Sequence, residues 1–170
     1  MSQNQVSENQ KDLESYQEEL KKAEESGDKR GIAKALYNLA FIHQQQGAIQ
    51  EAITLFNKSL EIAKELHDET STAITLSKLG GIYHNKGDLV EAKKLYEMAL
   101  EIDEKTFGPD HPTVARDIKD LGMVLQDLGD LLGAKKDLER VLEIDEKTFG
   151  PDHPPAKRIR SNLEELESRL

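Results

Sequence analysis

The sequence predicts an all-α solenoid built from stacked antiparallel helix pairs, and three observations lead to this prediction. A segment of thirteen residues, LEIDEKTFGPDHP, occurs at Leu100–Pro112 and again at Leu142–Pro154. Apolar and aromatic residues recur at helical spacing, as in the stripe of Ala73, Leu76 and Tyr83. No segment alternates apolar and polar residues as a half-buried strand would. Because one helix pair cannot bury its own apolar stripe, we expect the pairs to stack.

Three repeat units of 40–42 residues cover most of the chain, and we place them at residues 29–68, 69–110 and 111–152. Equivalent positions carry the same residue type in each unit: Ala33, Ala73 and Ala115; Leu39, Leu79 and Leu121; Gly47, Gly87 and Gly129; Ala52, Ala92 and Ala134. The glycine lies between two helical stripes, so each unit is expected to hold two helices joined by a tight turn.

The ends of the chain continue the pattern in part. Residues 1–10 are polar, and we expect a disordered tail there, followed by a single domain over residues 11–170. Residues 12–28 resemble the second helix of a unit that lacks its first. Residues 154–170 are apolar along one face only, which is typical of a capping helix. The prediction is therefore about eight helices in total.

Composition excludes several classes of function. The chain has 33 acidic and 23 basic residues, a net charge of −10, which argues against general nucleic-acid binding. It has no cysteine, so disulfides and thiolate metal sites are excluded. No apolar run reaches the ~20 residues of a membrane span, and the N-terminus lacks the apolar stretch of a signal peptide. We expect a cytoplasmic protein without membrane contact.

No pattern in the sequence points to catalysis, a cofactor or a metal ion. The phosphate-binding, zinc-protease and serine-hydrolase motifs are all missing. His111 and His153 lie beside Asp and Pro, but they recur at equivalent repeat positions, so we interpret them as turn and cap residues. Phe107 and Phe149 are either interaction anchors or core residues at helix ends, and burial is favoured. We expect a protein that is not an enzyme.

The repeats resemble the tetratricopeptide repeat (TPR). The family pattern W-x2-L-G-x2-Y…A-x3-F reads here as Leu76-x2-Leu79-Gly80-x2-Tyr83, then Ala92-x3-Tyr96, with an aliphatic residue in place of Trp. The 42-residue spacing and the segment ALEIDEKTFGPDHPTVA resemble more narrowly the long repeats of kinesin light chains. The resemblance implies a right-handed superhelical solenoid whose first helices line a concave groove that binds a peptide or helix of another protein.

Carried over position by position, the resemblance implies a groove with two features. Basic residues lie near the N-termini of the first helices, and an apolar patch lies farther along. The candidate groove residues are Lys34, Tyr37, Asn38, Phe41, Lys78, His84, Asn85, Arg116, Lys119, Met123 and Arg160. A basic row in an acidic chain favours an acidic ligand with an apolar anchor. The alternative is that Lys and Arg are simply good exposed helix formers.

One partner of the family is not expected here. Chaperone-binding members hold a C-terminal carboxylate with Lys, Asn and Arg side chains on successive first helices. The corresponding positions in this chain are Tyr37, Phe41, Lys78, Arg116 and Asp120. Only Arg116 fits that role, and Asp120 would repel the ligand, so we expect no binding of chaperone tails.

The function predicted from the sequence is a non-catalytic protein–protein interaction adaptor or scaffold. The alternative is a structural assembly module, in which the groove is filled by another copy of the chain or by a neighbouring domain.

Overall fold

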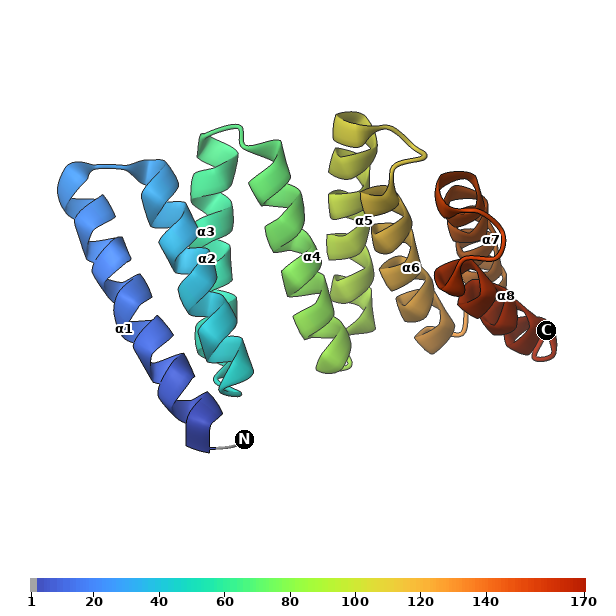
Figure 1. Ribbon diagram of the computed structural model, residues 1–170, viewed down its shortest axis with the longest axis horizontal. Helices are drawn as coiled ribbons and strands as arrows, with labels where there is room; N and C mark the ends of the chain where they lie inside the picture. The colour runs from blue at the N-terminus through green and yellow to red at the C-terminus, as the bar shows by residue number, and fades with distance from the viewer. Residues whose placement is uncertain (1–2) are drawn as a thin grey trace. The chain divides into compact units, whose positions relative to one another are not determined.

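The computed structural model describes residues 3–170, with side chains from residue 10 onward, and this part of the chain is all α-helical (Figure 1). Its helices are α1 (Gln3–Ser26), α2 (Lys29–Gln45), α3 (Ile49–Glu65), α4 (Glu69–Asn85), α5 (Leu89–Phe107), α6 (Pro112–Asp127), α7 (Leu131–Phe149) and α8 (Pro154–Glu167). The chain divides into two compact parts, and the boundary along the sequence falls within α4, between Thr75 and Leu76. Each part is described by itself.

The predicted all-α fold of about eight helices is confirmed over the described residues. The N-terminus differs from the prediction, because α1 begins at Gln3 and residues 3–10 are helical where a disordered tail was expected. No Gly or Pro interrupts residues 3–26, so a helix nucleated farther along the chain can extend back to that point. Residues 1–2 of the expected tail lie outside the described residues.

Short turns with capping aspartates join many of the helices. Asp28, Asp88 and Asp130 each accept a hydrogen bond from the backbone N–H three residues ahead, which satisfies an amide at the helix start. Gly87 precedes Asp88 with a φ of +80°, a conformation that costs a residue with a Cβ free energy. The turn chemistry therefore explains why Gly-Asp interrupts the helical pattern within a unit.

In the first part of the chain, α2 packs against both α1 and α3 (Figure 1). Phe56 of α3 is fully buried, and the ring of Tyr37 meets it edge-on with centroids 5.3 Å apart. Ser59 is also buried, and its hydroxyl donates to the carbonyl oxygen of Ala33 at 2.8 Å. The contacts place Tyr37 at the edge of the core.

In the second part, α5, α6, α7 and α8 pack in chain order around one apolar core. Ala92 and Tyr96 of α5 belong to this core, together with Ile118 of α6 and Leu138 of α7. A Cβ added to Gly80 would lie 3.2 Å from the Tyr96 ring. The glycine of the second repeat therefore makes room for the aromatic side chain.

The repeated segment GPDHP forms the turn between successive units. His111 caps α6, because its Nδ1 accepts the backbone N–H of Thr113 at 3.2 Å, which agrees with the predicted cap role. The rings of Phe107 and His111 stack with centroids 4.8 Å apart, and Phe149 stacks on His153 in the same way. The two phenylalanines are 40% and 49% exposed, so burial in the core, the favoured alternative, is wrong. A histidine ring covers one face of each and leaves the rest open.

Candidate functional site

A pocket of about 310 Å³ opens in the first part of the chain. Its lining comes from α2, α3, the α3–α4 turn and the start of α4, and includes Arg30, Lys34, Tyr37, Ser71 and Ile74. Ile74 is an exposed apolar side chain, and Lys34 is exposed as well. The pocket therefore combines two basic groups with aromatic and aliphatic surface.

A second pocket of about 440 Å³ opens in the second part, among α6, α7 and α8. Three basic residues line it, Arg116 and Lys119 from α6 and Arg158 from α8. Met123 and Phe149, each about half exposed, supply apolar surface to the same pocket. We call this set of five side chains the basic pocket.

The structure brings together some of the groove residues that the sequence predicts. Lys34 and Tyr37 line the first pocket, and Arg116, Lys119 and Met123 line the basic pocket. Six others line neither of these pockets: Asn38, Phe41, Lys78, His84, Asn85 and Arg160. Phe41 is nevertheless 37% exposed on the same helix as Tyr37.

Arg160 and His84 each contact a carboxylate on another helix. The Arg160 guanidinium lies 2.5 Å from Glu146 of α7, and His84 Nε2 lies 2.7 Å from Asp127 of α6. On α8 it is Arg158, not Arg160, that lines the basic pocket. Sequence reasoning missed Arg158 because the segment HPTVA is replaced by HPPA at the start of this helix, which leaves its register against the earlier repeats open. Arg158 follows Arg116 by 42 residues, which is the length of the repeat, and this spacing was the available signal.

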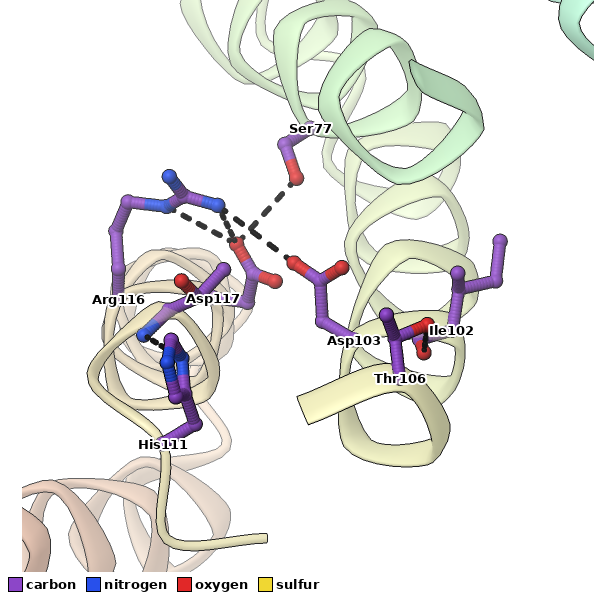
Figure 2. Close-up of polar contacts among 8 residues, drawn as sticks. Ser77, Ile102, Asp103, Thr106, His111, Arg116 and Asp117 are labelled. Atoms are coloured by element: carbon purple, nitrogen blue, oxygen red, sulfur yellow. Dashed lines mark hydrogen bonds and ion pairs between the residues drawn. The ribbon is translucent and has the colours of Figure 1, made fainter. Parts of the chain in front are cut away.

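Arg116 also contacts a buried carboxyl pair behind the basic pocket (Figure 2). Its Nη2 lies 3.0 Å from Asp117 Oδ1 on α6 and 3.7 Å from Asp103 Oδ2 on α5. Ser77 of α4 donates its hydroxyl to Asp117 Oδ1 at 3.4 Å. Both carboxyls are nearly free of solvent, with 2% exposure at Asp103 and none at Asp117. One guanidinium thus faces two buried acids.

Burial sets the titration of this region. It raises the pKa of Asp103 to about 7, assisted by the hydrogen bond and the charge of Asp117 and opposed by Arg116. Burial also raises the pKa of Tyr96 to about 12, with the nearby Asp120 and Asp117 acting in the same direction. These shifts follow from packing acids between helices.

The described residues hold no group of three or more His, Cys, Asp or Glu side chains placed to bind a metal ion. Among the described helices, none has the length and apolar character needed to cross a membrane.

Comparison with protein families identifies the repeat. One model of the tetratricopeptide repeat matches residues 13–65, 31–83 and 71–131, and a second matches residues 120–155. Together they span most of the chain. The chain belongs to the tetratricopeptide repeat family. The predicted resemblance is confirmed, and TPR proteins are typically non-catalytic interaction modules, which supports a protein–protein interaction adaptor in general.

Solved TPR structures share the fold. BtubC (BKLC) from P. vanneervenii has a TM-score of 0.77 at 21% identity, over 95% of this chain and 66% of that one. A protein from Podosopora anserina designated a kinesin light chain, with nearly identical TPR-like repeats, has a TM-score of 0.79 at 24% identity, over 96% of this chain and 80% of that one. These structures support the predicted similarity to kinesin light chain repeats.

The N-terminal domain of stress-induced protein-1 from C. elegans is also similar, with a TM-score of 0.65 at 19% identity, over 82% of this chain and 98% of that one. A search among curated protein sequences gave no significant match.

Proposed function

We propose that this TPR protein is a non-catalytic adaptor whose basic pocket binds an acidic segment of a partner protein through its carboxylates and one apolar side chain. The observation that carries the proposal is the convergence of Arg116, Lys119 and Arg158 around a single pocket in a chain of net charge −10. Helix propensity alone would scatter these residues over the acidic surface. A cytoplasmic location remains part of the proposal.

Local charge favours an acidic ligand. Asp145 is the acidic residue in the pocket lining, against three basic ones. Pro112 and Pro155 also line the pocket, and both lie in the first turn of their helices, α6 and α8. The positive ends of two helix dipoles therefore lie at the pocket and add to the attraction for carboxylates.

The apolar part of the pocket favours one anchoring side chain. Met123 is 48% exposed, and its flexible thioether side chain can adapt to different apolar groups. Phe149 offers a ring held from one side by His153. A pocket of about 440 Å³ has room for one large side chain such as Leu or Phe.

A synthetic peptide library tests the proposal. Each acidic decapeptide carries one Leu or Phe, whose position is varied along the peptide, and has a neutral counterpart in which Gln replaces Glu. Binding of each labelled peptide to the protein is measured by fluorescence polarisation. We expect binding by acidic members with the apolar residue present. The double variant Lys119→Glu/Arg158→Glu should weaken binding by about tenfold, since it reverses two charges at a partly exposed site.

The matched control, Lys94→Glu with Lys136→Glu, makes the same two charge reversals at exposed positions of α5 and α7. It should leave the affinity almost unchanged. Equal weakening by the control and the double variant, or equal binding of neutral and acidic peptides, would overturn the proposal.

The assembly alternative has its own observation. Val90 and Leu132 are exposed apolar residues at equivalent positions near the starts of α5 and α7. Self-association through such residues would give a dimer or larger species in sedimentation at high concentration. A monomer under those conditions favours the open pocket.

Binding of a chaperone C-terminal tail is not part of the proposal. Asp120 is partly buried on α6, three residues before Met123. A carboxylate at that position would repel a second carboxylate. We expect no binding of a peptide that ends in Glu-Glu-Val-Asp, and micromolar affinity for that peptide would contradict this expectation.

A further inference from the structure

The buried carboxyl pair of Asp103 and Asp117 couples the core of the second part to the basic pocket. Figure 2 shows the two carboxyls facing each other from α5 and α6, with the Arg116 guanidinium above them. Asp117 Oδ1 accepts hydrogen bonds from Arg116 and Ser77, whereas its buried Oδ2 has no hydrogen-bond donor when both carboxyls are ionised. A protonated Asp103 supplies that donor, since the two carboxyls lie within hydrogen-bond reach.

The other helix junctions show that the repeat does not need this pair. One repeat earlier, the equivalent positions hold Ala63 and Thr75. The Thr75 hydroxyl donates a hydrogen bond to the Ser71 carbonyl oxygen of the same helix. One repeat later, Asp145 is the counterpart of Asp103, and it shares a pocket with Arg158 instead of facing a second carboxyl. The acid pair is thus a feature of the α5–α6 junction and not a requirement of helix stacking.

Charge balance at the junction depends on one proton. With a proton on the pair, one carboxylate faces the Arg116 guanidinium and the two charges cancel. Without it, two carboxylates share a single guanidinium at a buried position, which is costly. Asp120 and Lys119 of α6 and His84 of α4 also lie at this junction, and the un-ionised Tyr96 of α5 packs against it.

We propose that Asp103 holds a proton that it donates to the Asp117 carboxylate, and that loss of this proton draws the charge of Arg116 away from the basic pocket. The inference rests on the proposed function in one respect, since it describes how that same pocket is regulated. Arg116 both lines the pocket and contacts the pair, so a change in the charge of the pair changes the charge that an acidic ligand meets. Acidic ligands should therefore bind more tightly at pH 6 than at pH 8.

The first test needs no ligand. The side-chain carboxyl carbon of Asp103 is followed by NMR as the pH is raised from 4 to 9, together with the Nε–Hε signal of Arg116. We expect the Asp103 signal to titrate with a midpoint near pH 7, and the Arg116 signal to move at the same midpoint. A midpoint near that of an ordinary aspartate, or an Arg116 signal that does not follow Asp103, would overturn the inference.

Two variants make the test specific. Asp103→Asn keeps the shape and supplies an amide donor to Asp117 without a titrating proton, so the Arg116 signal should no longer move near pH 7. Glu101→Gln neutralises an exposed carboxyl on the same helix, outside the basic pocket, and should leave the pH response of the Arg116 signal as it is in the wild type. If Asp103→Asn fails to fold, Asp117→Asn provides the same measurement from the other side of the pair.

The second test uses the tightest-binding acidic peptide of the library. For the wild type and for Glu101→Gln, we expect about two- to fivefold weaker binding at pH 8 than at pH 6, the effect of one charge at a partly exposed site. For Asp103→Asn, the affinity should be the same at both pH values. The same pH dependence in all three proteins would contradict the inference. Failure of every peptide to bind would instead contradict the proposed function. The NMR titration would still show whether Asp103 holds the proton.

Discussion

At the scale of single residues, two glycines at equivalent repeat positions face different neighbours. A Cβ on Gly80 would lie 3.2 Å from three atoms of the Tyr96 ring, which is 5% exposed and has little room to shift. A Cβ on Gly122 would lie 3.5 Å from the Asp137 Cβ and 3.9 Å from the Ala134 carbonyl oxygen, and both are ordinary contacts. The same substitution should therefore act in opposite directions.

We expect Gly122→Ala to raise the free energy of unfolding by about 0.5–1 kcal/mol, because alanine favours the helix. Gly80→Ala should lower it by about 1 kcal/mol, since overpacking against Tyr96 exceeds the helix gain. Urea unfolding followed by circular dichroism gives both values. Equal shifts of the same sign would show that the Tyr96 ring does not confine Gly80.

Asp137 on α7 predicts a pH dependence of stability. Its Oδ2 is buried without a hydrogen-bond partner, and burial raises the pKa of this carboxyl to about 6 from the ordinary 3.8. The folded state therefore keeps this proton at pH values where the unfolded chain has lost it, so stability falls as the pH rises from about 4 to about 6. Above that range the full penalty of the buried charge remains.

Asp137→Asn removes that penalty. We expect its melting temperature to exceed that of the wild type above pH 6, with the difference shrinking toward pH 4. Glu143→Gln, an exposed neutralisation on the same helix, should leave the wild-type profile in place. A melting-temperature difference that stays constant from pH 4 to pH 8 would contradict the buried titration.

Residue-level interactions were only partly predictable from the sequence. The pairing of small residues with aromatic ones followed from the repeat pattern, and Gly80 beside Tyr96 agrees with it. The pairing of Asp103 with Asp117 could not be predicted, because in the sequence each aspartate looks like an exposed helix residue. Only the packing of α5 on α6 removes the two side chains from water. A buried charge is a consequence of tertiary structure that helical periodicity does not reveal.

At the scale of elements, the helix pair α4–α5 depends on small residues in its contact stripe. Ala92 is fully buried in the core of the second part. Ala92→Leu should lower the free energy of unfolding by about 1–3 kcal/mol, because the added carbons have no cavity to fill. Lys94→Leu, an exposed position on the same helix, is the control, and thermal unfolding measures both. An unchanged melting temperature for Ala92→Leu would mean that this stripe is not tightly packed.

Helix boundaries were predictable because each turn carries its own signal. The pattern Gly-Asp places the turn between α4 and α5, and GPDHP places the one between α5 and α6. The register of α8 was not predictable in the same way, because Pro154 and Ala156 are one residue closer together than Pro112 and Ala115 of the previous repeat. In the structure Arg158, and not the predicted Arg160, lines the basic pocket.

At the scale of the whole molecule, a chain of net charge −10 presents a local cluster of positive charge. The family and the fold followed from the repeat, since the repeat itself is the architecture. The candidate site followed only in part, because a pocket depends on which side chains converge after packing. Arg116, Lys119 and Met123 were predicted, whereas Arg158 and Phe149 joined them through the packing of α6, α7 and α8.

The central claim is that acidic segments bind at the basic pocket, and chemical-shift mapping tests it most directly. The tightest-binding library peptide is added to isotope-labelled protein, and backbone and methyl signals are recorded. We expect the largest chemical-shift changes at Met123 and at the pocket residues of α6 and α8. Added salt should reduce these changes, because it screens the charges that hold the peptide. Changes confined to the outer surface of α7, or to the exposed residues Val90 and Leu132, would contradict the account.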